Sequence, residues 1–288
     1  MTPRRFQQVI PYLLLIPSIV FLLIFFAYPM VEAFGLAFRS EDGSGWTLEH
    51  FQTMIGDVAF GPALRTTLVL IVVLIPVQFV VAFSMALVVQ AKLKGSGLFL
   101  YIFAIPLAIS ELAAGIVWFA IFTERGYLNS LLTTTGLLSR PFIFLSYQRL
   151  EWLLTAVVLA EVWRATSIIM VILVAGMQSI PHEFLEAADV FGATLWQKIR
   201  RVILPMLRPS LQVALILRTI LAFQVFAVAL AVAGRGITLL AAEAYRWYNT
   251  YRDPNVAAAF AVLIMTLSIA TTVFYLGTLR TRPEEMAL

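Results

Sequence analysis

Four ionisable side chains interrupt long apolar stretches of the sequence: Glu111, Glu161, Arg164 and Arg218. A charge in the hydrocarbon region of a membrane is costly, so residues of this kind face a protein interface or a water-filled cavity. Glu161 and Arg164 are i, i+3 neighbours on a helix and can partly neutralise each other. Two interpretations follow. The charges line a path for a polar substrate, or they form structural pairs that hold helices together.

Other polar and aromatic residues at comparable depth fit the first interpretation. A sugar requires hydrogen-bonding groups and an aromatic face on which its ring can stack. Trp163 adjoins Arg164, while Gln224 and Phe226 follow Arg218 by one to two helical turns. On the second interpretation, the aromatic side chains contribute only to packing. The predicted substrate path comprises Glu161, Trp163, Arg164, Arg218, Gln224 and Phe226.

Motifs for catalysis and metal binding are absent from the sequence. It contains no cysteine, which excludes disulfides and thiol chemistry. No Gly-x-x-x-x-Gly-Lys-Ser/Thr loop occurs, so any ATP hydrolysis must take place in another subunit. His50 and His182 are 132 residues apart, on opposite sides of the predicted membrane topology, and cannot form a zinc site together. Glu183 and Glu186 have the spacing of an acid/base pair, but acidic residues also favour helix N-termini. We therefore predict a protein without a catalytic site, metal or cofactor of its own.

The composition is that of a membrane protein, with 61% hydrophobic and 12% charged residues. The net charge of +4 is small, and no nucleic-acid partner is predicted from it. A helix needs about 20 apolar residues to cross a bilayer. We predict an all-α polytopic fold with one transmembrane domain over residues 1–288. The six expected spans are roughly 10–36, 63–90, 98–122, 152–176, 207–232 and 255–279.

Basic residues indicate the orientation of these spans. If the N-terminus lies in the cytoplasm, the internal segments carry ten Lys and Arg residues, including all three lysines, against eight in the external segments. Arg4 and Arg5 precede an apolar stretch of more than twenty residues, which favours a retained first span over a cleaved leader. We therefore predict a multi-pass protein of the cell membrane with both termini in the cytoplasm.

The loop 177–206 is longer than a simple connector requires. Apolar residues recur at helical spacing on both sides of Gly192, a residue type that favours the positive φ of a helix end. Pro205 and Pro209 interrupt the way into the next span. We predict two short helices on the cytoplasmic face that form a docking surface for a soluble partner. Their apolar stripes comprise Phe184, Ala187, Ala188 and Phe191, and then Leu195, Trp196, Ile199, Val202 and Ile203.

Within this loop, Glu186-Ala187-Ala188, Gly192-Ala193 and Ile203-Leu204-Pro205 resemble the EAA loop of permease subunits in binding-protein-dependent ABC importers. The first span around Tyr28-Pro29 and the segment Gly126–Leu132 are similar to the carbohydrate-type branch, which includes maltose, trehalose and glycerol-phosphate importers.

The resemblance implies a six-span permease subunit that couples ATP hydrolysis in a separate subunit to alternating access. The implied partners are a second homologous permease, two ATP-binding subunits that hold ATP and Mg²⁺, an extracytoplasmic substrate-binding protein and membrane lipid. The implied coupling residues are Glu186, Ala187, Ala188, Gly192, Ala193, Leu204 and Pro205.

Three alternatives remain open. The cargo can be a glycerol-phosphate ester or a polyol instead of a sugar, because Arg164 or Arg218 suits a phosphate. A secondary transporter would show matching halves with broken helices, and none are evident in the sequence. A membrane-embedded enzyme would need a catalytic constellation, and the sequence shows none.

Overall fold

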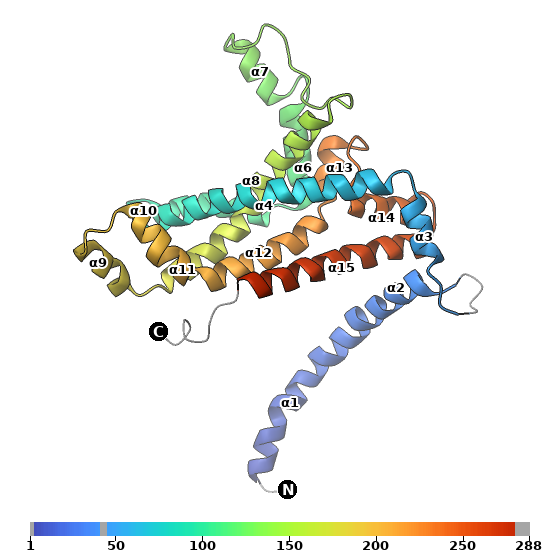
Figure 1. Ribbon diagram of the computed structural model, residues 1–288, viewed down its shortest axis with the longest axis horizontal. Coiled ribbons are helices and arrows are strands. Elements are labelled where there is room, and N and C mark those ends of the chain that lie inside the picture. The colour runs from blue at the N-terminus through green and yellow to red at the C-terminus, as the bar shows by residue number, and fades with distance from the viewer. Residues whose placement is uncertain (1–2, 41–44, 280–288) are drawn as a thin grey trace. The chain divides into compact units, whose positions relative to one another are not determined.

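The computed structural model describes residues 3–40 and 45–279, which are almost entirely helical (Figure 1). The all-α prediction is confirmed. An isolated antiparallel bridge joins Arg39 to Trp46. In chain order the helices are α1 (Pro3–Leu22), η1 (Leu23–Ala27), α2 (Tyr28–Phe38), α3 (Glu49–Gly56), α4 (Phe60–Gln90), α5 (Ser96–Ala104), η2 (Ile105–Ala108), α6 (Glu111–Phe122), α7 (Tyr127–Thr134), α8 (Leu150–Gln178), α9 (His182–Val190), α10 (Leu195–Lys198), η3 (Ile199–Ile203), α11 (Leu204–Met206), α12 (Arg208–Phe223), α13 (Ala227–Ala233), α14 (Leu240–Asn249) and α15 (Pro254–Thr278).

Four continuous helical segments are long and apolar enough to cross a membrane: Tyr12–Phe38, Phe60–Gln90, Leu150–Gln178 and Pro254–Thr278. They correspond to the first, second, fourth and sixth predicted spans. Two further pairs of helices pass the same test but are sharply bent, which brings the number of spans to six if each pair counts as one.

The predicted third span, 98–122, is wrong as a single helix. The helical segment Ser96–Ala108 ends before α6 begins, and the pair Ser96–Ala108 and Glu111–Thr134 is bent by 103°. The Ser110 side chain caps α6 by accepting a hydrogen bond of 3.3 Å from the Ala113 N–H. Hydropathy did not reveal this break, because a single serine in an apolar run scarcely lowers the average.

The predicted fifth span, 207–232, is also wrong as a single helix. The helix α12 ends at Phe223, residues 224–226 leave the helical path, and α13 begins at Ala227. Before this span, the pair Leu195–Met206 and Arg208–Phe223 is bent by 70°. Pro209 lies in the first turn of α12, where its missing N–H costs no hydrogen bond within the helix.

The described residues separate into two compact units, which we treat individually. One comprises the chain up to Phe60 together with Glu243–Leu263, and the other comprises Gly61–Ala242 together with the residues from Ile264. In the first unit, the rings of Phe60 and Phe260 pack 6.2 Å apart. On α14, Arg246 pairs with Glu243 and lies 3.7 Å from a carboxylate oxygen of Asp57. Burial raises the pKa of the Glu243 carboxyl, while the attraction of Arg246 opposes the shift.

The second unit is built around α8, which contributes buried side chains to two apolar clusters. The first half of α8 packs against α6 and α13 through Leu153, Ala156, Val157 and Ala160. Its second half packs towards α12 and towards the end of the loop that joins α8 to α12, through Ile169, Met170, Leu173 and Met177. The helix α4 is divided similarly, since Leu70 and Leu74 join the first cluster, whereas Ala82 and Ala86 join the second.

A glycine allows two of these helices to cross closely. A Cβ atom at Gly176 of α8 would collide with the Ser210 hydroxyl and approach a Leu207 methyl group to 2.9 Å. Without a side chain at this position, the end of α8 can lie against the start of α12. The segment between these two helices is therefore held firmly at both of its ends.

Candidate functional site

The four charges that the sequence singled out lie together in the second unit. We call Glu111, Glu161, Arg164, Arg218 and their neighbour Gln78 the charge cluster. The Glu161 carboxylate is its centre. One carboxylate oxygen accepts a hydrogen bond of 2.9 Å from Arg218 Nη2, and the other accepts bonds of 3.2 and 3.1 Å from Nε and Nη2 of Arg164. Arg164 Nη2 also donates to the Glu111 carboxylate at 2.8 Å.

Gln78 of α4 is a member that sequence analysis missed. Its side-chain oxygen accepts a hydrogen bond of 2.6 Å from Arg218 Nε, and its amide nitrogen donates to the Glu161 backbone carbonyl at 2.9 Å. The signal was present, since Gln78 is a lone amide in an apolar run, but no pattern indicated its partners. The cluster thereby joins four helices: α4, α6, α8 and α12.

Burial divides the cluster into an inner and an outer part. The side chains of Glu161 and Arg218 are 0% and 1% exposed, and Gln78 is equally buried. The outer pair is more open, with 18% of the Arg164 side chain and 35% of the Glu111 side chain exposed. The inner part lies between the two apolar clusters along both α4 and α8, where unpaired charges would be very costly.

The outer pair lies beside the breaks in two spans. Glu111 is the first residue of α6, directly after the break in the third span. Its carboxylate also interacts with the backbone of Ala227, the first residue of α13, directly after the break in the fifth span. Irregular backbone at membrane depth is tolerated where it is buried in protein or lines a water-filled cavity. The two breaks and the exposed end of the cluster therefore share one place in the fold.

The remaining residues of the predicted path lie apart from these ion pairs. Trp163 is partly exposed, and its ring meets that of Trp118 edge-on at 6.1 Å. Gln224 is exposed at the end of α12, where its N–H donates to the Leu221 carbonyl at 3.2 Å. Phe226 is partly buried and precedes α13. Gln224 and Phe226 thus form the break itself.

The predicted docking loop contains the two expected short helices, α9 and α10. The helix α9 ends at Val190, and Gly192 follows with φ of +68°, as predicted for a helix end. The N–H of Gly192 donates to the Asp189 carbonyl, and the N–H of Ala193 donates to the Ala188 carbonyl, both at 2.9 Å. The Thr194 side chain then caps α10 in a capping box with Gln197.

The tip of this loop exposes large apolar side chains. We call His182–Met206 the docking segment. Phe191 is 88% exposed, and Leu195 and Trp196 are each 67% exposed. An ion pair of 2.6 Å between Lys198 and Asp189 joins α10 to α9. The segment is braced internally but leaves an apolar tip uncovered in this chain.

The base of the docking segment is anchored in the second apolar cluster through buried Ile199 and Ile203. A hydrogen bond of 3.0 Å joins His182 at the start of α9 to Lys92, which follows α4. Of the predicted coupling residues, Glu186 and Ala187 are exposed on α9 and Gly192 is exposed at the turn. The others, Ala188, Ala193, Leu204 and Pro205, are partly buried.

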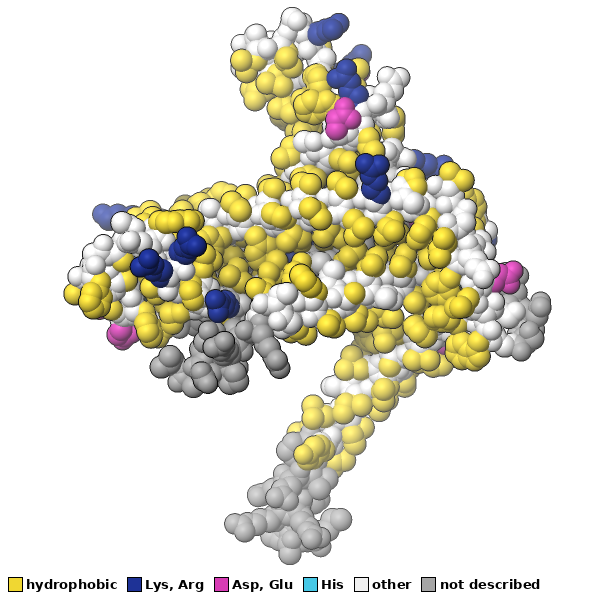
Figure 2. Space-filling view, in the orientation of Figure 1, with side chains coloured by type: hydrophobic (Ala, Val, Ile, Leu, Met, Phe, Trp, Pro, Cys, Tyr) yellow, Lys and Arg dark blue, Asp and Glu magenta, His cyan; other side chains and the backbone are white. Residues whose placement is uncertain are grey.

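Basic side chains are unevenly distributed over the surface of the second unit. In Figure 1 the docking segment lies at one end of α8, and α7 lies beyond its other end. In Figure 2 dark-blue basic side chains gather over both of these ends, whereas the surface over α4 between them is mostly yellow. This arrangement suits a bundle whose middle contacts lipid or a neighbouring subunit.

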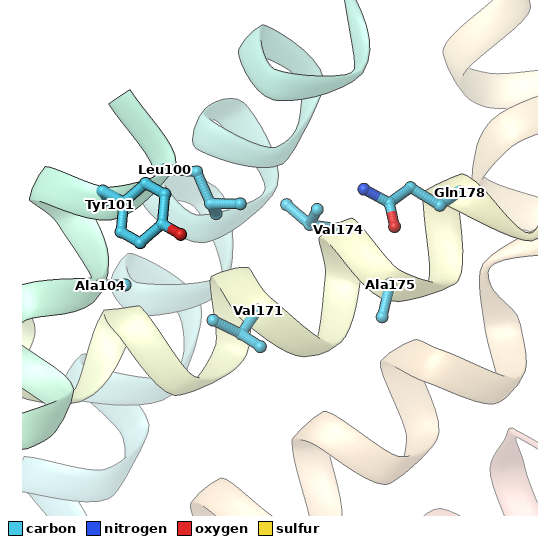
Figure 3. Close-up of a pocket in the computed structure, with 7 residues that line it drawn as sticks. All are labelled: Leu100, Tyr101, Ala104, Val171, Val174, Ala175 and Gln178. Carbon is cyan, nitrogen blue, oxygen red and sulfur yellow. The ribbon is translucent and has the colours of Figure 1, made fainter. Parts of the chain in front are cut away.

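Two pockets lie outside the charge cluster. The first, of about 320 Å³, is a groove between α5 and α8 whose polar groups come from Tyr101 and Gln178 (Figure 3). The second, of about 750 Å³, lies near α7 and includes Glu124 and Arg125 among its lining residues. Neither lining contains a member of the charge cluster. Among residues 3–40 and 45–279, no group of three or more His, Asp or Glu side chains could hold a metal.

Comparison with known proteins supports one family. Residues 78–279 match the family described as "Binding-protein-dependent transport system inner membrane component". The trehalose transport system permease protein SugA of Mycobacterium tuberculosis is 27% identical over 95% of this chain and 89% of its own length. The sn-glycerol-3-phosphate transport system permease protein UgpA of Agrobacterium fabrum is 28% identical over 93% of this chain and 94% of its own length.

The fold is also shared with a solved structure. A chain in the crystal structure of a bacterial alginate ABC transporter, in complex with an alginate pentasaccharide-bound periplasmic protein, superposes with a TM-score of 0.81. The match covers 96% of each chain at 22% sequence identity. This similarity extends over the bent helices as well as the continuous spans.

Proposed function

Because the chain belongs to the family of binding-protein-dependent transport system inner membrane components, we propose that it is a permease subunit of an ATP-driven importer for a sugar or a related carbohydrate. The docking segment is the observation that carries this proposal. A short two-helix element with an uncovered tip of Phe191, Leu195 and Trp196 suits a groove on a soluble partner. We assign that partner as the ATP-binding subunit, which binds ATP and Mg²⁺.

The complete importer would contain this chain, a second homologous permease, two ATP-binding subunits and an extracytoplasmic binding protein. The basic residues near the docking segment support its placement in the cytoplasm, with both termini on the same side of a bacterial or archaeal cell membrane. The terminal residues 1–2 and 280–288 lie outside the described part of the chain. We treat residues 1–288 as a single permease domain.

ATP would drive transport through the docking segment. Closure of the two ATP-binding subunits would move α9 and α10 as a unit, since the Lys198–Asp189 ion pair and the Gly192 turn hold them together. The segment joins α8 directly to α12, and these two helices carry Glu161, Arg164 and Arg218. Reversing an equilibrium between outward-open and inward-open states from 1:99 to 99:1 requires about 5.5 kcal/mol of differential binding.

The substrate path would run beside the charge cluster and the break at Gln224 and Phe226. Sugars suit this place because it offers carboxylate, guanidinium and amide groups, together with the rings of Trp163 and Phe226. A second candidate cargo, a glycerol-phosphate ester or a polyol, is favoured by the similarity to UgpA and by Arg164.

The direct test is reconstitution. A tag on this chain should retain an ATP-binding subunit when the neighbouring transporter genes are expressed with it, and vesicles containing the complex should take up labelled trehalose, maltose or sn-glycerol 3-phosphate only with ATP and the binding protein. Uptake by this chain alone, without an ATP-binding subunit, would support a secondary transporter instead.

A further inference from the structure

We propose that Glu111 and Arg164 contact the cargo and restrict it to neutral, polyhydroxylated molecules, with Glu161, Arg218 and Gln78 acting as positioning residues behind them. This inference rests on the proposed function as an importer permease. It separates the two cargo classes, sugars and phosphate esters, that the sequence left open.

Solvent exposure distinguishes the residues that contact the cargo from the positioning residues behind them. Glu161, Arg218 and Gln78 are sealed between the apolar clusters, so a passing solute cannot reach them. The Arg164 and Glu111 side chains are 18% and 35% exposed. Glu161 receives hydrogen bonds from both Nε and Nη2 of Arg164, which fixes the plane of that guanidinium. The outer pair is therefore reachable and already oriented.

Charge pairing argues against an anionic cargo. Arg218 is matched by Glu161 at 2.9 Å, and Arg164 is matched by Glu111 at 2.8 Å and by Glu161 at 3.1 Å. Two arginines and two glutamates give the cluster no net charge. A phosphate requires an excess of donors, such as an arginine free to bind it with both nitrogens. Here Glu111 is the more exposed member of the outer pair, so an approaching anion would meet a carboxylate first and be repelled.

A sugar hydroxyl suits the same pair. It can donate a hydrogen bond to the Glu111 carboxylate and accept one from the Arg164 guanidinium, and adjacent hydroxyls on a ring can do both at once. The pair also lies where the third and fifth spans are broken, at the first residues of α6 and α13. Broken helices at membrane depth surround the substrate in many transporters, because they place polar backbone groups beside the path.

The test compares neutral and anionic probes in the assembled importer, reconstituted with its binding protein. The probes are labelled trehalose, maltose and sn-glycerol 3-phosphate. The variants are Glu111→Gln, which keeps the shape of the side chain but removes its charge, and Glu151→Gln, the same change at an exposed position on α8. Because the binding protein is identical in every sample, a difference between variants reports on this chain.

We expect uptake of a neutral sugar in preference to sn-glycerol 3-phosphate. Glu111→Gln should raise the half-saturating concentration of the transported sugar by about fivefold or more, the loss expected for one charge-assisted hydrogen bond. Its complex should purify in normal yield, and Glu151→Gln should match the wild type. If Glu111→Gln does not assemble, Glu111→Asp keeps the charge but shortens the reach, and it should assemble with a raised half-saturating concentration.

Two results would overturn the inference: preferential uptake of sn-glycerol 3-phosphate, or an unchanged half-saturating concentration in the assembled Glu111 variants. A wild-type chain that retains no ATP-binding subunit, or that takes up a probe without ATP, would overturn the proposed function itself, and the inference with it. The wild-type measurement therefore distinguishes the two failures.

Discussion

The charge cluster and the docking segment are two regions of the second unit that use polar groups in opposite ways. In the cluster, Glu161 accepts from two arginines and is wholly buried. In the docking segment, an ion pair between Lys198 and Asp189 braces two short helices, and the tip is apolar and exposed. The contrast shows that this chain pairs its buried charges with one another and leaves the apolar tip of the docking segment uncovered.

Removing the centre of the cluster should have the largest effect. Glu161→Ala leaves both Arg164 and Arg218 without their shared carboxylate in a buried site, which typically costs about 3–5 kcal/mol. We expect little intact protein after detergent extraction and a markedly lower unfolding temperature. Glu151→Ala, on the exposed first turn of the same helix, is the matched control and should behave as wild type. Normal yield of Glu161→Ala would show that the cluster does not hold the helices together.

Removing the docking tip should leave the fold intact and weaken a single interface. Trp196→Ala deletes a ring that is 67% exposed in this chain, so the free energy of unfolding should change little. Buried aromatic anchors at interfaces often contribute about 2 kcal/mol or more to binding, so affinity for the ATP-binding subunit should fall about thirtyfold. Titration of that subunit onto the purified permease measures the change. If Trp196→Ala lowered the free energy of unfolding as much as it lowered the free energy of binding, the tip would support the fold as well as the interface, and the contrast with the charge cluster would fail.

Altering the turn should affect coupling more than folding. Gly192 has φ of +68° and open space around its Cα, so Gly192→Val introduces backbone strain of about 1–3 kcal/mol without a steric clash. We expect transport to fall relative to ATP hydrolysis in the reconstituted complex. Gly136 provides the control, with φ of +76° and equally open surroundings outside the docking segment. If Gly136→Val reduced coupling as much as Gly192→Val does, the turn at Gly192 would have no special role in coupling.

The smallest effect concerns an ion pair outside both regions. Burial holds the pKa of Glu243 above its ordinary value of 4.5 in the folded state. Protonation therefore favours the folded form, so this group's contribution to stability is greatest below pH 4.5 and declines as the pH rises through the raised pKa. Glu243→Gln should flatten that decline. Thermal unfolding of both proteins across this pH range measures the difference, and parallel curves would contradict it.

The sequence predicted the docking segment better than the cluster because its signals are local. The spacing of apolar residues, Gly192 before a turn and the prolines after it all act within a few residues of one another, and they specify two short helices. The positive φ of Gly192 is an example of a backbone feature that can be inferred from residue type.

The cluster depends on distant residues that one sequence does not connect. The cost of burying charge indicated that Glu111, Glu161, Arg164 and Arg218 needed partners, and the i, i+3 spacing supplied one pair. Gln78 lies 140 residues from Arg218, and no periodicity reveals their contact. The breaks before Glu111 and Ala227 were hidden for a related reason, since hydropathy averages over an irregular turn as readily as over a helix.

The central claim is that the apolar tip of the docking segment contacts an ATP-binding subunit while the opposite end of α8 does not. Because the chain contains no cysteine, Phe191→Cys places a unique thiol at that tip, and Ser139→Cys places one in the exposed loop beyond α7. A thiol-to-amine cross-linker applied to the assembled importer, followed by mass spectrometry, should join residue 191 but not residue 139 to the ATP-binding subunit. A cross-link from residue 139, or none from residue 191 in an intact complex, would contradict the account.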